Sequence, residues 1–388
     1  MRPDIFKASL DPSLFRIYRR YLYSRYKATD ELALPEVVHE IAKDKLLRMA
    51  GKFRDNADYF DPGSQLNVKV GRHVLNGPVG VAAGFDKDCE ILTPMSYVFG
   101  FLNPGSVLRD ARPGNPQRPR SKRTVRITVD NEREAIVNAQ GYPHKGLDNV
   151  VENLEKFASG PRGHAKVLLN FSGISDAYTE DSTLDSCREI ISRTSPYVDF
   201  GFEESRTSPN TDFNRVLETP DFTRKIIDLM NSHVPSGLVK ASKISPYSSL
   251  TPSEEERENK LKCVRVFHEN GGDMVVLGNT RSVPTKGLVP RFERDHAGES
   301  GRPLFPYMLK LVETVHTKFP DLAIVACGGI FSGEDAWKAY EKGATLVSLY
   351  TALTFRGFGL VKEIHDYLIK KLAGDSLEAY LERRDSRL

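Results

Sequence analysis

The sequence has few cysteines and no long apolar segment. Its four cysteines, Cys89, Cys187, Cys263 and Cys327, lie far apart and form no C-x-x-C pair, so we predict neither a zinc site nor an iron–sulfur site. No run of about 20 apolar residues occurs, and we therefore expect no membrane-spanning helix. The first ten residues lack the apolar core and small-residue cleavage pattern of a secretory signal. Together these absences predict a protein that folds in a reducing compartment.

A large excess of charge of one sign is also missing. The 55 Lys and Arg residues and 52 Asp and Glu residues give a net charge of +3, with the two signs mixed along the chain. This balance argues against nucleic acid as a partner. Neither a strand–GxGxxG–helix unit nor a GxxxxGK(S/T) loop is present, which argues against a dinucleotide site and a P-loop.

What the sequence does contain, from Pro78 onward, is a regular alternation of short apolar runs and amphipathic stretches of helix length. Eight runs rich in Val, Ile and Leu occur at residues 79–83, 99–105, 166–171, 198–203, 237–244, 273–278, 323–328 and 345–350. Helices are predicted at residues 147–157, 185–193, 222–231, 252–267, 304–318, 334–341 and 360–372. This alternation predicts an α/β protein with a parallel sheet, and eight strands are the number that closes a (β/α)8 TIM barrel.

The segment before the barrel predicts two helices within residues 12–53. The apolar stripes of these helices consist of Leu14, Phe15, Ile17, Tyr18, Tyr21 and Leu22, and of Val37, Val38, Ile41, Leu46 and Leu47. Arg16, Arg19, Arg20, Arg25 and Lys27 border the first stripe, a composition typical of a helix that lies at a membrane surface. A helical pair packed on the barrel explains the same pattern. We therefore divide the chain into a helical extension, residues 1–53, and a barrel, residues 54–388.

Polar residues gather where the apolar runs end. In a barrel of this kind the active site is built from the loops that follow the strands, so these positions are the informative ones. They comprise the segments 82–88, 105–106, 205–211, 278–280, 327–330 and 350–351, together with Asn170, Lys240 and Lys243. Lysine is rare inside a buried strand unless it has a charged partner, so Lys240 and Lys243 are candidates for a functional role.

Two glycines, Gly328 and Gly329, follow the seventh run, and polar residues end the eighth. This pattern matches the corner of barrel enzymes where backbone N–H groups hold a phosphate. We therefore predict a phosphorylated cofactor, and flavin mononucleotide (FMN) is the simplest candidate.

Six segments, taken in order, resemble a known family. They are AAGFDKD at 82–88, SPNT at 208–211, KISP at 243–246, GNT at 278–280, SGRPL at 300–304, and Tyr350 with FRG at 355–357. Their order and spacing resemble dihydroorotate dehydrogenase over residues 35–372. Ser208 stands where the soluble class of that family has a cysteine base, and a helical extension precedes the barrel. Both features resemble class 2, the quinone-dependent enzymes.

The resemblance implies oxidation of (S)-dihydroorotate to orotate with FMN and a quinone acceptor, a step in de novo pyrimidine (UMP) biosynthesis. Ser208 would remove a proton from carbon 5 of the substrate, and Lys243 would place positive charge near the flavin pyrimidine. The residues implied to bind dihydroorotate and orotate are Lys87, Asn138, Ala139, Gln140, Gly141, Tyr142, Asn210, Asn279 and Thr280. Those implied to surround FMN are Ala83, Gly84, Lys87, Ser106, Asn170, Ser205, Lys243, Gly278, Gly301, Gly329, Tyr350 and Thr351.

The resemblance also implies that the extension forms a tunnel for the quinone tail, with His39 and Arg120 beside it. The alternative is that both residues are simply exposed to solvent, His39 as a surface histidine and Arg120 as part of the basic stretch 118–126, and this explains their presence almost as well as a tunnel does. The helices would attach the protein to a membrane surface as a peripheral protein. The lack of a clear presequence favours the cytoplasmic face of a bacterial inner membrane, with the mitochondrial inner membrane as the alternative.

Several residues depart from the family pattern inside the active region. Ser205 replaces an asparagine, the segment NAQGYPH at 138–144 replaces NRMGFNN, and SGI at 172–174 replaces GKN. An unpaired polar atom of the substrate costs roughly 1–3 kcal/mol in a closed site, so these changes bear on activity. Three hypotheses follow: a working dihydroorotate dehydrogenase, a diverged FMN-dependent barrel oxidoreductase acting on another small cyclic substrate, and a non-catalytic flavin-binding relative.

Overall fold

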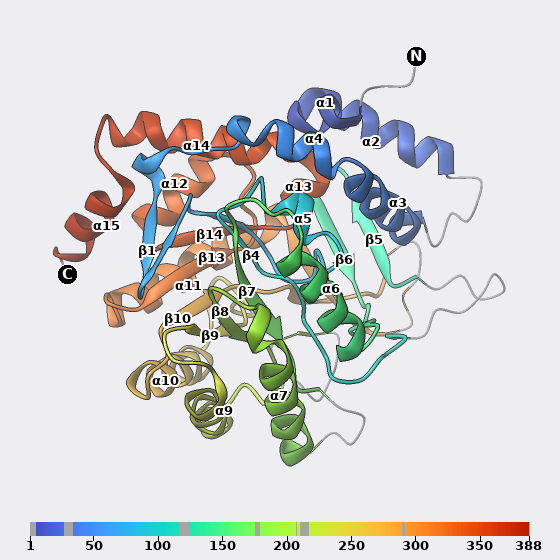
Figure 1. Cartoon of the computed structure of the whole chain (residues 1–388). Helices are drawn as coiled ribbons and strands as arrows, with labels where there is room; N and C mark the ends of the chain where they lie inside the picture. Colours follow the sequence, from blue (N-terminus) through green and yellow to red (C-terminus); the bar gives the residue numbers. More distant parts are fainter. Residues whose placement is uncertain are drawn as a thin grey trace.

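The computed structural model describes residues 5–26, 34–115, 125–174, 179–206, 208–209, 217–288, 292 and 294–387. Eight parallel strands close into a barrel, in the order β10-β13-β14-β3-β4-β7-β8-β9 around the ring (Figure 1). They are β3 (Val79–Val81), β4 (Phe101–Leu102), β7 (Lys166–Phe171), β8 (Gly201–Glu204), β9 (Val239–Ile244), β10 (Met274–Leu277), β13 (Ala323–Cys327) and β14 (Leu346–Leu349). Each of the eight predicted runs contains a barrel strand or most of its residues, so the predicted TIM barrel is confirmed.

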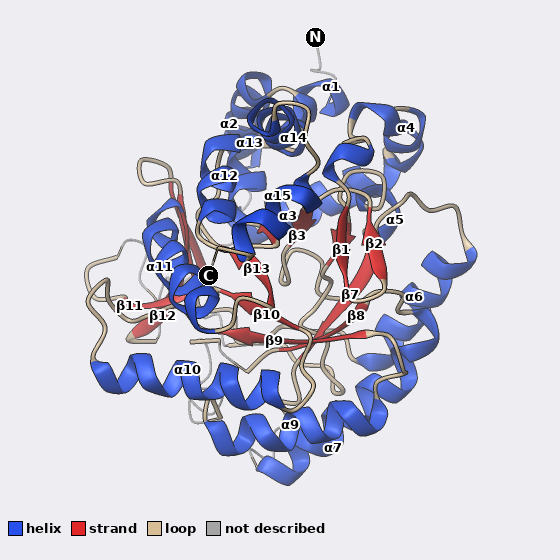
Figure 2. Ribbon diagram, turned by 90° about the vertical axis from the view of Figure 1, so that its left-hand side faces the viewer, coloured by secondary structure: helices blue, strands red, loops and turns tan. Residues whose placement is uncertain are grey.

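Helices cover the outside of the barrel (Figure 2). They are α5 (Leu92–Met95), α6 (Leu147–Ser159), α7 (Glu180–Thr194), α9 (Pro220–His233), α10 (Glu254–Glu269), α11 (Phe305–Lys318), α12 (Gly333–Glu341), α13 (Thr351–Arg356), α14 (Gly359–Leu372) and α15 (Leu377–Asp385). Short 3-10 helices occur at η1 (Ala57–Tyr59), η2 (Ser64–Leu66), η3 (Ser195–Tyr197) and η4 (Arg302–Leu304). Helix α12 begins where the sequence predicts, because the Ser332 hydroxyl accepts a hydrogen bond from the Asp335 N–H.

Large side chains fill the end of the barrel opposite the strand carboxyl ends. The Phe101 and Phe200 rings lie 6.2 Å apart, and both are fully buried. A Cβ on Gly80 would come within 2.3 Å of the Phe101 ring, so β3 carries a glycine at this level because the neighbouring phenylalanine occupies the space. The barrel is therefore a packed core, and open space remains at the other end of the strands.

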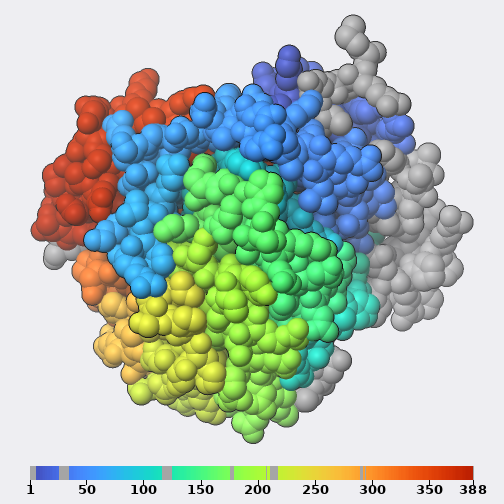
Figure 3. Space-filling view, in the orientation of Figure 1, coloured from blue at the N-terminus to red at the C-terminus, as the bar shows by residue number. Residues whose placement is uncertain are grey.

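A second sheet, which the sequence patterns did not reveal, is built from insertions that follow β4 and β10. It has four antiparallel strands in the order β11-β12-β6-β5, namely β11 (Arg281–Pro284), β12 (His296–Gly301), β6 (Ala135–Asn138) and β5 (Ile127–Asp130). We call it the cap sheet. Another hairpin, β1 (Val68–Val70) with β2 (His73–Leu75), precedes the barrel. In Figure 3 this early segment, in light blue, adjoins the C-terminal helices in red.

The N-terminal segment contains more helices than predicted. The two helices expected over residues 12–53 correspond to α2 (Pro12–Tyr26), α3 (Leu34–Arg48) and α4 (Ala50–Asp55), and α1 (Ile5–Leu10) precedes them. The second expected helix is interrupted at Met49, where the backbone leaves helical geometry. Among the described residues, no helix is both long and apolar enough to cross a membrane.

Candidate active site

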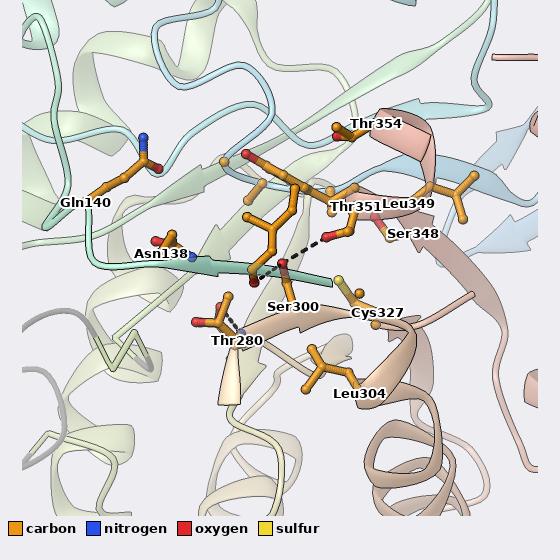
Figure 4. Close-up of a pocket in the computed structure, with 18 of the residues that line it drawn as sticks. Asn138, Gln140, Thr280, Ser300, Leu304, Cys327, Ser348, Leu349, Thr351 and Thr354 are labelled. Atoms are coloured by element: carbon orange, nitrogen blue, oxygen red, sulfur yellow. Dashed lines mark hydrogen bonds between the residues drawn. The ribbon is translucent and has the colours of Figure 1, made fainter. Parts of the chain in front are cut away.

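A cavity opens at the carboxyl ends of the barrel strands, between the barrel and the cap sheet (Figure 4). Residues from seven of the strand ends reach it, together with residues from the cap sheet and the N-terminal helices. The predicted site residues that line it are Ala83, Gly84, Lys87, Ser106, Asn138, Gln140, Tyr142, Ser205, Ser208, Lys243, Asn279, Thr280, Gly301, Gly329, Tyr350 and Thr351. Residues selected at the strand ends and residues implied by the resemblance therefore share one cavity.

Several other predicted residues that the structure describes are not part of this lining. Ala139 packs into a small hydrophobic cluster of the cap sheet, and a Cβ on Gly141 would collide with the Asn115 side chain at 2.3 Å. Gly278 lies behind the cavity wall, where a Cβ would come within 1.9 Å of the Cys327 carbonyl oxygen. Asn210 and Arg120 are outside the described residues. The second strand lysine, Lys240, contacts the Asn231 side chain on α9 at 2.8 Å and does not line the cavity.

Lys87 provides a cation at one wall of the cavity. Its Nζ donates a hydrogen bond to Gln140 Oε1 at 2.9 Å, so the first strand end is joined to the loop after β6. Burial lowers the pKa of Lys87 to about 8, with Glu36 opposing this shift and Arg126 adding to it. A carboxylate ligand beside this amine would restore its charge and gain a charge-assisted hydrogen bond.

Lys243 lies on the floor of the cavity beside a buried carboxylate. Its Nζ is 3.4 Å from Glu203 Oε1, and the two side chains are 5% and 0% exposed. Asn170 Nδ2 donates to the same Glu203 oxygen at 2.8 Å. Burial opposes the charge of Lys243, but attraction from Glu203 and Cys327 leaves its pKa above the usual value. The lysine is therefore positively charged, with a counter-charge directly beneath it.

Two buried acceptors in this group have no partner. Asn170 Oδ1 and Glu203 Oε2 each make no hydrogen bond within the described part of the chain. Buried acceptors of this kind are normally satisfied by a ligand or an ordered water. The floor of the cavity is thus arranged for a polar group.

The glycine corner forms the opposite wall. Gly328 and Gly329 have φ angles of 133° and 74°, which favour glycine, and a Cβ on Gly329 would lie 2.4 Å from the Phe305 nitrogen. No described residue accepts a hydrogen bond from the N–H of Gly329 or Ile330. Such N–H groups, next to the first turn of α13, fit the phosphate of a flavin mononucleotide. The donor set therefore suits the predicted cofactor.

Hydroxyl groups connect this corner to the cap sheet. Thr351 Oγ1 donates to Ser300 Oγ at 2.9 Å, and Ser300 Oγ donates to the Ile136 carbonyl at 3.1 Å, as the dashed lines in Figure 4 show. Gly301 lies beside them, and a Cβ there would meet the Glu134 carbonyl at 2.2 Å. The cap sheet is thereby fixed against the last βα loop of the barrel.

In the segment 138–144, which departs from the family pattern, some residues line the cavity and others support the loop. Asn138 lines the cavity and donates to the Gly298 carbonyl at 3.3 Å. His144 is buried away from the cavity, where its Nδ1 accepts the Gly146 N–H at 2.9 Å and its backbone pairs with Arg112. The histidine that replaces a family asparagine thus supports the loop.

The N-terminal helices complete the cavity. Tyr23 of α2 and Pro35 of α3 belong to its lining, so it extends from the barrel floor to the space between these helices. His39 does not line it, but its ring lies 6.3 Å from Phe85, which packs at 5.7 Å on Tyr350. Burial, with help from Lys87, lowers the pKa of His39 to about 4, so this imidazole is neutral.

Arg120, which was expected beside the same quinone tunnel as His39, lies outside the described residues, but another arginine of the same basic stretch is described. Arg126 Nε donates to Glu36 Oε1 at 3.0 Å and so joins the cap sheet to α3. Sequence reasoning also missed Glu203. This residue ends the apolar run 198–203, where an acidic side chain reads as the polar boundary of the strand, and only its position facing Lys243 identifies it.

A closed parallel barrel whose cavity at the strand carboxyl ends is lined by lysines and paired glycines is the arrangement of a (β/α)8-barrel enzyme. Residues 65–372 match the family model described as dihydroorotate dehydrogenase. The chain is 30% identical to "Dihydroorotate dehydrogenase (quinone)" of Azorhizobium caulinodans, with 92% of this chain and 97% of the relative covered. The chain is 29% identical to "Dihydroorotate dehydrogenase (quinone), mitochondrial" of Lachancea kluyveri, with 79% of this chain and 72% of the relative covered.

The fold agrees with these relatives. Ligand-free DHODH from Eimeria tenella superposes with a TM-score of 0.71 at 27% identity, covering 88% of this chain and 98% of that one. The chain belongs to the dihydroorotate dehydrogenase family, and its relatives place it in the quinone-dependent class 2.

Proposed function

We propose that this protein oxidises (S)-dihydroorotate to orotate and passes the electrons to a quinone, as a step of de novo pyrimidine biosynthesis. The observation that carries the proposal is the convergence of Lys87, Asn138, Ser208, Lys243 and Asn279 on one cavity of a class 2 family member. A planar, anionic, amide-bearing substrate needs fixed cations, donors and acceptors of this kind.

FMN is the proposed flavin, and when bound it would supply the two-electron redox chemistry that links oxidation at carbon 6 of the substrate to reduction of a quinone. Gly329, Ile330 and Thr351 would hold its phosphate. Lys243 would lie near its pyrimidine ring, where positive charge favours the reduced anion. The unpaired acceptors of Asn170 and Glu203 would serve as partners for ring N–H groups or an ordered water.

Ser208 is the proposed base that removes the proton from carbon 5. It lines the cavity and is only partly exposed, which suits a hydroxyl that must lose its proton away from bulk water. Lys87 would pair with the substrate carboxylate, while Asn138, Gln140, Asn279 and Thr280 would bind its ring amides. In this arrangement Lys87 would neutralise the charge of the substrate carboxylate at one wall of the cavity, and Ser208 would remove the proton at another.

The quinone is proposed to enter between α2 and α3, since Tyr23 and Pro35 already extend the cavity to that gap. Leu14, Ile17 and Tyr21 of α2 and Leu47 of α3 are large apolar side chains that face solvent. Such a surface supports peripheral attachment of the helical extension to a membrane that contains quinone. The named relatives include bacterial and mitochondrial enzymes, and either inner membrane would suit.

The experiment is anaerobic stopped-flow absorbance of the purified flavoprotein mixed with L-dihydroorotate. Rapid bleaching of the flavin band is expected, and Ser208→Ala should slow it by about 100-fold or more. An unchanged rate in Ser208→Ala would make the base assignment wrong. A flavin that dithionite reduces but dihydroorotate does not would favour the diverged oxidoreductase or the non-catalytic relative.

A further inference from the structure

A second pocket lies outside the active-site cavity, between α2, the β5–β6 turn and the end of α13. Its lining contains four arginines, two glutamates, two aromatic rings and one asparagine: Arg16, Arg19, Arg20, Arg356, Glu132, Glu134, Tyr23, Phe355 and Asn131. The proposed oxidation of dihydroorotate assigns no task to these arginines. Four arginines in one pocket would favour the binding of an anionic ligand.

Two of the charged residues in the pocket are already paired. Glu134 accepts from Arg302 at 2.6 Å, and Arg356 donates to Glu363 at 2.6 Å and to the Phe331 carbonyl at 3.0 Å. Arg16 and Arg20 form no ion pair within the described residues. The positive charge that remains is therefore that of Arg16, Arg19 and Arg20, with Glu132 in the same lining and Glu134 attracting Arg19.

Two aromatic rings hold the guanidinium of Arg19 in a fixed position in the pocket. Its guanidinium carbon lies 4.1 Å from the Phe355 ring centre and 5.3 Å from that of Tyr23. Its Nε is buried and donates to no acceptor among the described residues. Burial lowers the pKa of Arg19 from its usual value, and Tyr23 opposes the shift through charge and a hydrogen bond. A fixed planar donor with an unused N–H matches phosphate oxygens.

The same helix exposes an apolar stripe to solvent. Leu14, Ile17 and Tyr21 are 47%, 64% and 40% exposed, and their spacing of three and four residues puts them on one face. Tyr18 and Leu22 lie next to this stripe around the helix and face the protein interior, at 6% exposure each. Apolar side chains beside an arginine pocket place a phosphate ligand at the boundary between water and hydrocarbon.

We propose that the pocket of Arg16, Arg19 and Arg20 binds the phosphate headgroup of an anionic phospholipid while the Leu14–Ile17–Tyr21 stripe enters the acyl region. The inference rests on the proposed membrane contact of the extension and adds lipid selectivity to it. Arg19 recognises the phosphate through its planar donors, and Arg16 and Arg20 attract it by charge. The bound lipid would hold α2 in a defined orientation at the mouth of the quinone path.

The test is co-sedimentation of the full-length flavoprotein with phosphatidylcholine vesicles that contain or lack phosphatidylglycerol. Wild-type protein should bind the anionic vesicles more tightly. Arg16→Gln/Arg20→Gln should weaken that binding by roughly 25-fold, at about fivefold per charge near the surface. The control Arg257→Gln/Arg265→Gln removes the same charge from α10 and should bind as wild type does.

Arg19→Lys separates a built site from diffuse attraction because it keeps the charge but loses the planar donors. We expect at least a fivefold loss on anionic vesicles with unchanged binding to phosphatidylcholine. Wild-type affinity in Arg19→Lys would overturn the site, as would tight calorimetric binding of glycerol phosphate without vesicles, which would identify a soluble ligand.

Failure of the lipid site remains distinguishable from failure of the proposed reaction. Flavin reduction by dihydroorotate is measured without vesicles, and each arginine variant should match wild type in that assay. Wild-type protein that binds neither kind of vesicle would overturn both the lipid site and the membrane contact, while dihydroorotate oxidation would stand.

Discussion

The Glu203 carboxylate lies 3.4 Å from the Lys243 ammonium, and both groups are almost completely buried beneath the active-site cavity. A lysine that contacts a flavin increases the electron affinity of the ring, because positive charge stabilises the reduced anion. A carboxylate at this distance offsets part of that effect. In the proposed arrangement, the pair would set how readily the flavin is reduced.

Replacing Glu203 by Gln should raise the reduction potential of the bound flavin. The change leaves an acceptor for Asn170 but removes the negative charge, and a shift on the order of +30 mV corresponds to about 1.4 kcal/mol in a two-electron couple. Spectroelectrochemical titration measures it. Glu218→Gln is the matched control, because Glu218 faces Lys260 at the same 3.4 Å, and Lys260, unlike Lys243, does not line the cavity. A potential unchanged or lowered in Glu203→Gln would contradict this role.

Dihydroorotate turnover should decline above about pH 8 because Lys87 loses its proton there. A pKa lowered from 10.5 to about 8 means that the amine is charged below this pH and neutral above it. The value of kcat/KM, which reports the free enzyme, should fall about tenfold per pH unit above the pKa. Lys87→Arg stays charged throughout, so its profile should be flat at a lower rate. The same decline in Lys87→Arg would assign the titration to another group.

His39→Ala should impair the quinone half-reaction and spare the dihydroorotate half-reaction. The His39 ring packs on Phe85 at the boundary between α3 and the barrel, and an increase in KM for quinone of about tenfold corresponds to about 1.4 kcal/mol. Steady-state assays with a soluble quinone give this constant, and stopped-flow gives the rate of flavin reduction. His233→Ala, at the end of α9, is the control. Slower flavin reduction in His39→Ala would place the histidine in the substrate site.

How much of this molecule the sequence predicts depends on the kind of element. The barrel strands were predictable because strands buried on both faces are continuous apolar runs, and β7 agrees with its predicted range at both ends. The cap sheet was missed because its strands are short and β5 is half-buried throughout, so residues such as Ile127 and Val129 form no distinctive run. One of its three pairings, between β6 and β12, also joins segments more than 150 residues apart, as between Asn138 and Gly298.

The sequence likewise predicted some residues of the candidate site and not others. Lys243 and the glycines of the phosphate corner were found because they follow or interrupt apolar runs. Glu203 was not, because an acidic residue near the end of a strand reads as the strand's polar boundary. Exposed Leu14 and Ile17 were predicted as part of an apolar stripe, but the direction in which that stripe faces depends on how α2 packs against α13.

Stability should fall as the solution is acidified from about pH 7 to about pH 5, and His365 should account for part of the fall. Burial lowers its pKa from 6.5 to about 4, so the unfolded chain binds a proton in this window that the folded chain does not. The folded state therefore gains stability as pH rises through the window, by about 2 kcal/mol between pH 5 and pH 7 for this group. Urea unfolding of wild type and His365→Phe at both pH values measures the difference. An equal pH dependence in the two proteins would exclude the histidine as its source.

The strand register of the cap sheet determines which side chains of β6 face the active-site cavity. Asn138 stands opposite Gly298 on one side and Ile127 on the other, and side chains alternate between the two faces of a strand. A shift of β6 by a single position would turn Asn138 out of the cavity and bring Val137 into it. Insertions in this strand are therefore forbidden, whereas exchanges of individual side chains are not. The expected departures of the segment 138–144 from the family pattern are exchanges of this permitted kind, because they change side chains and leave the length of the segment the same.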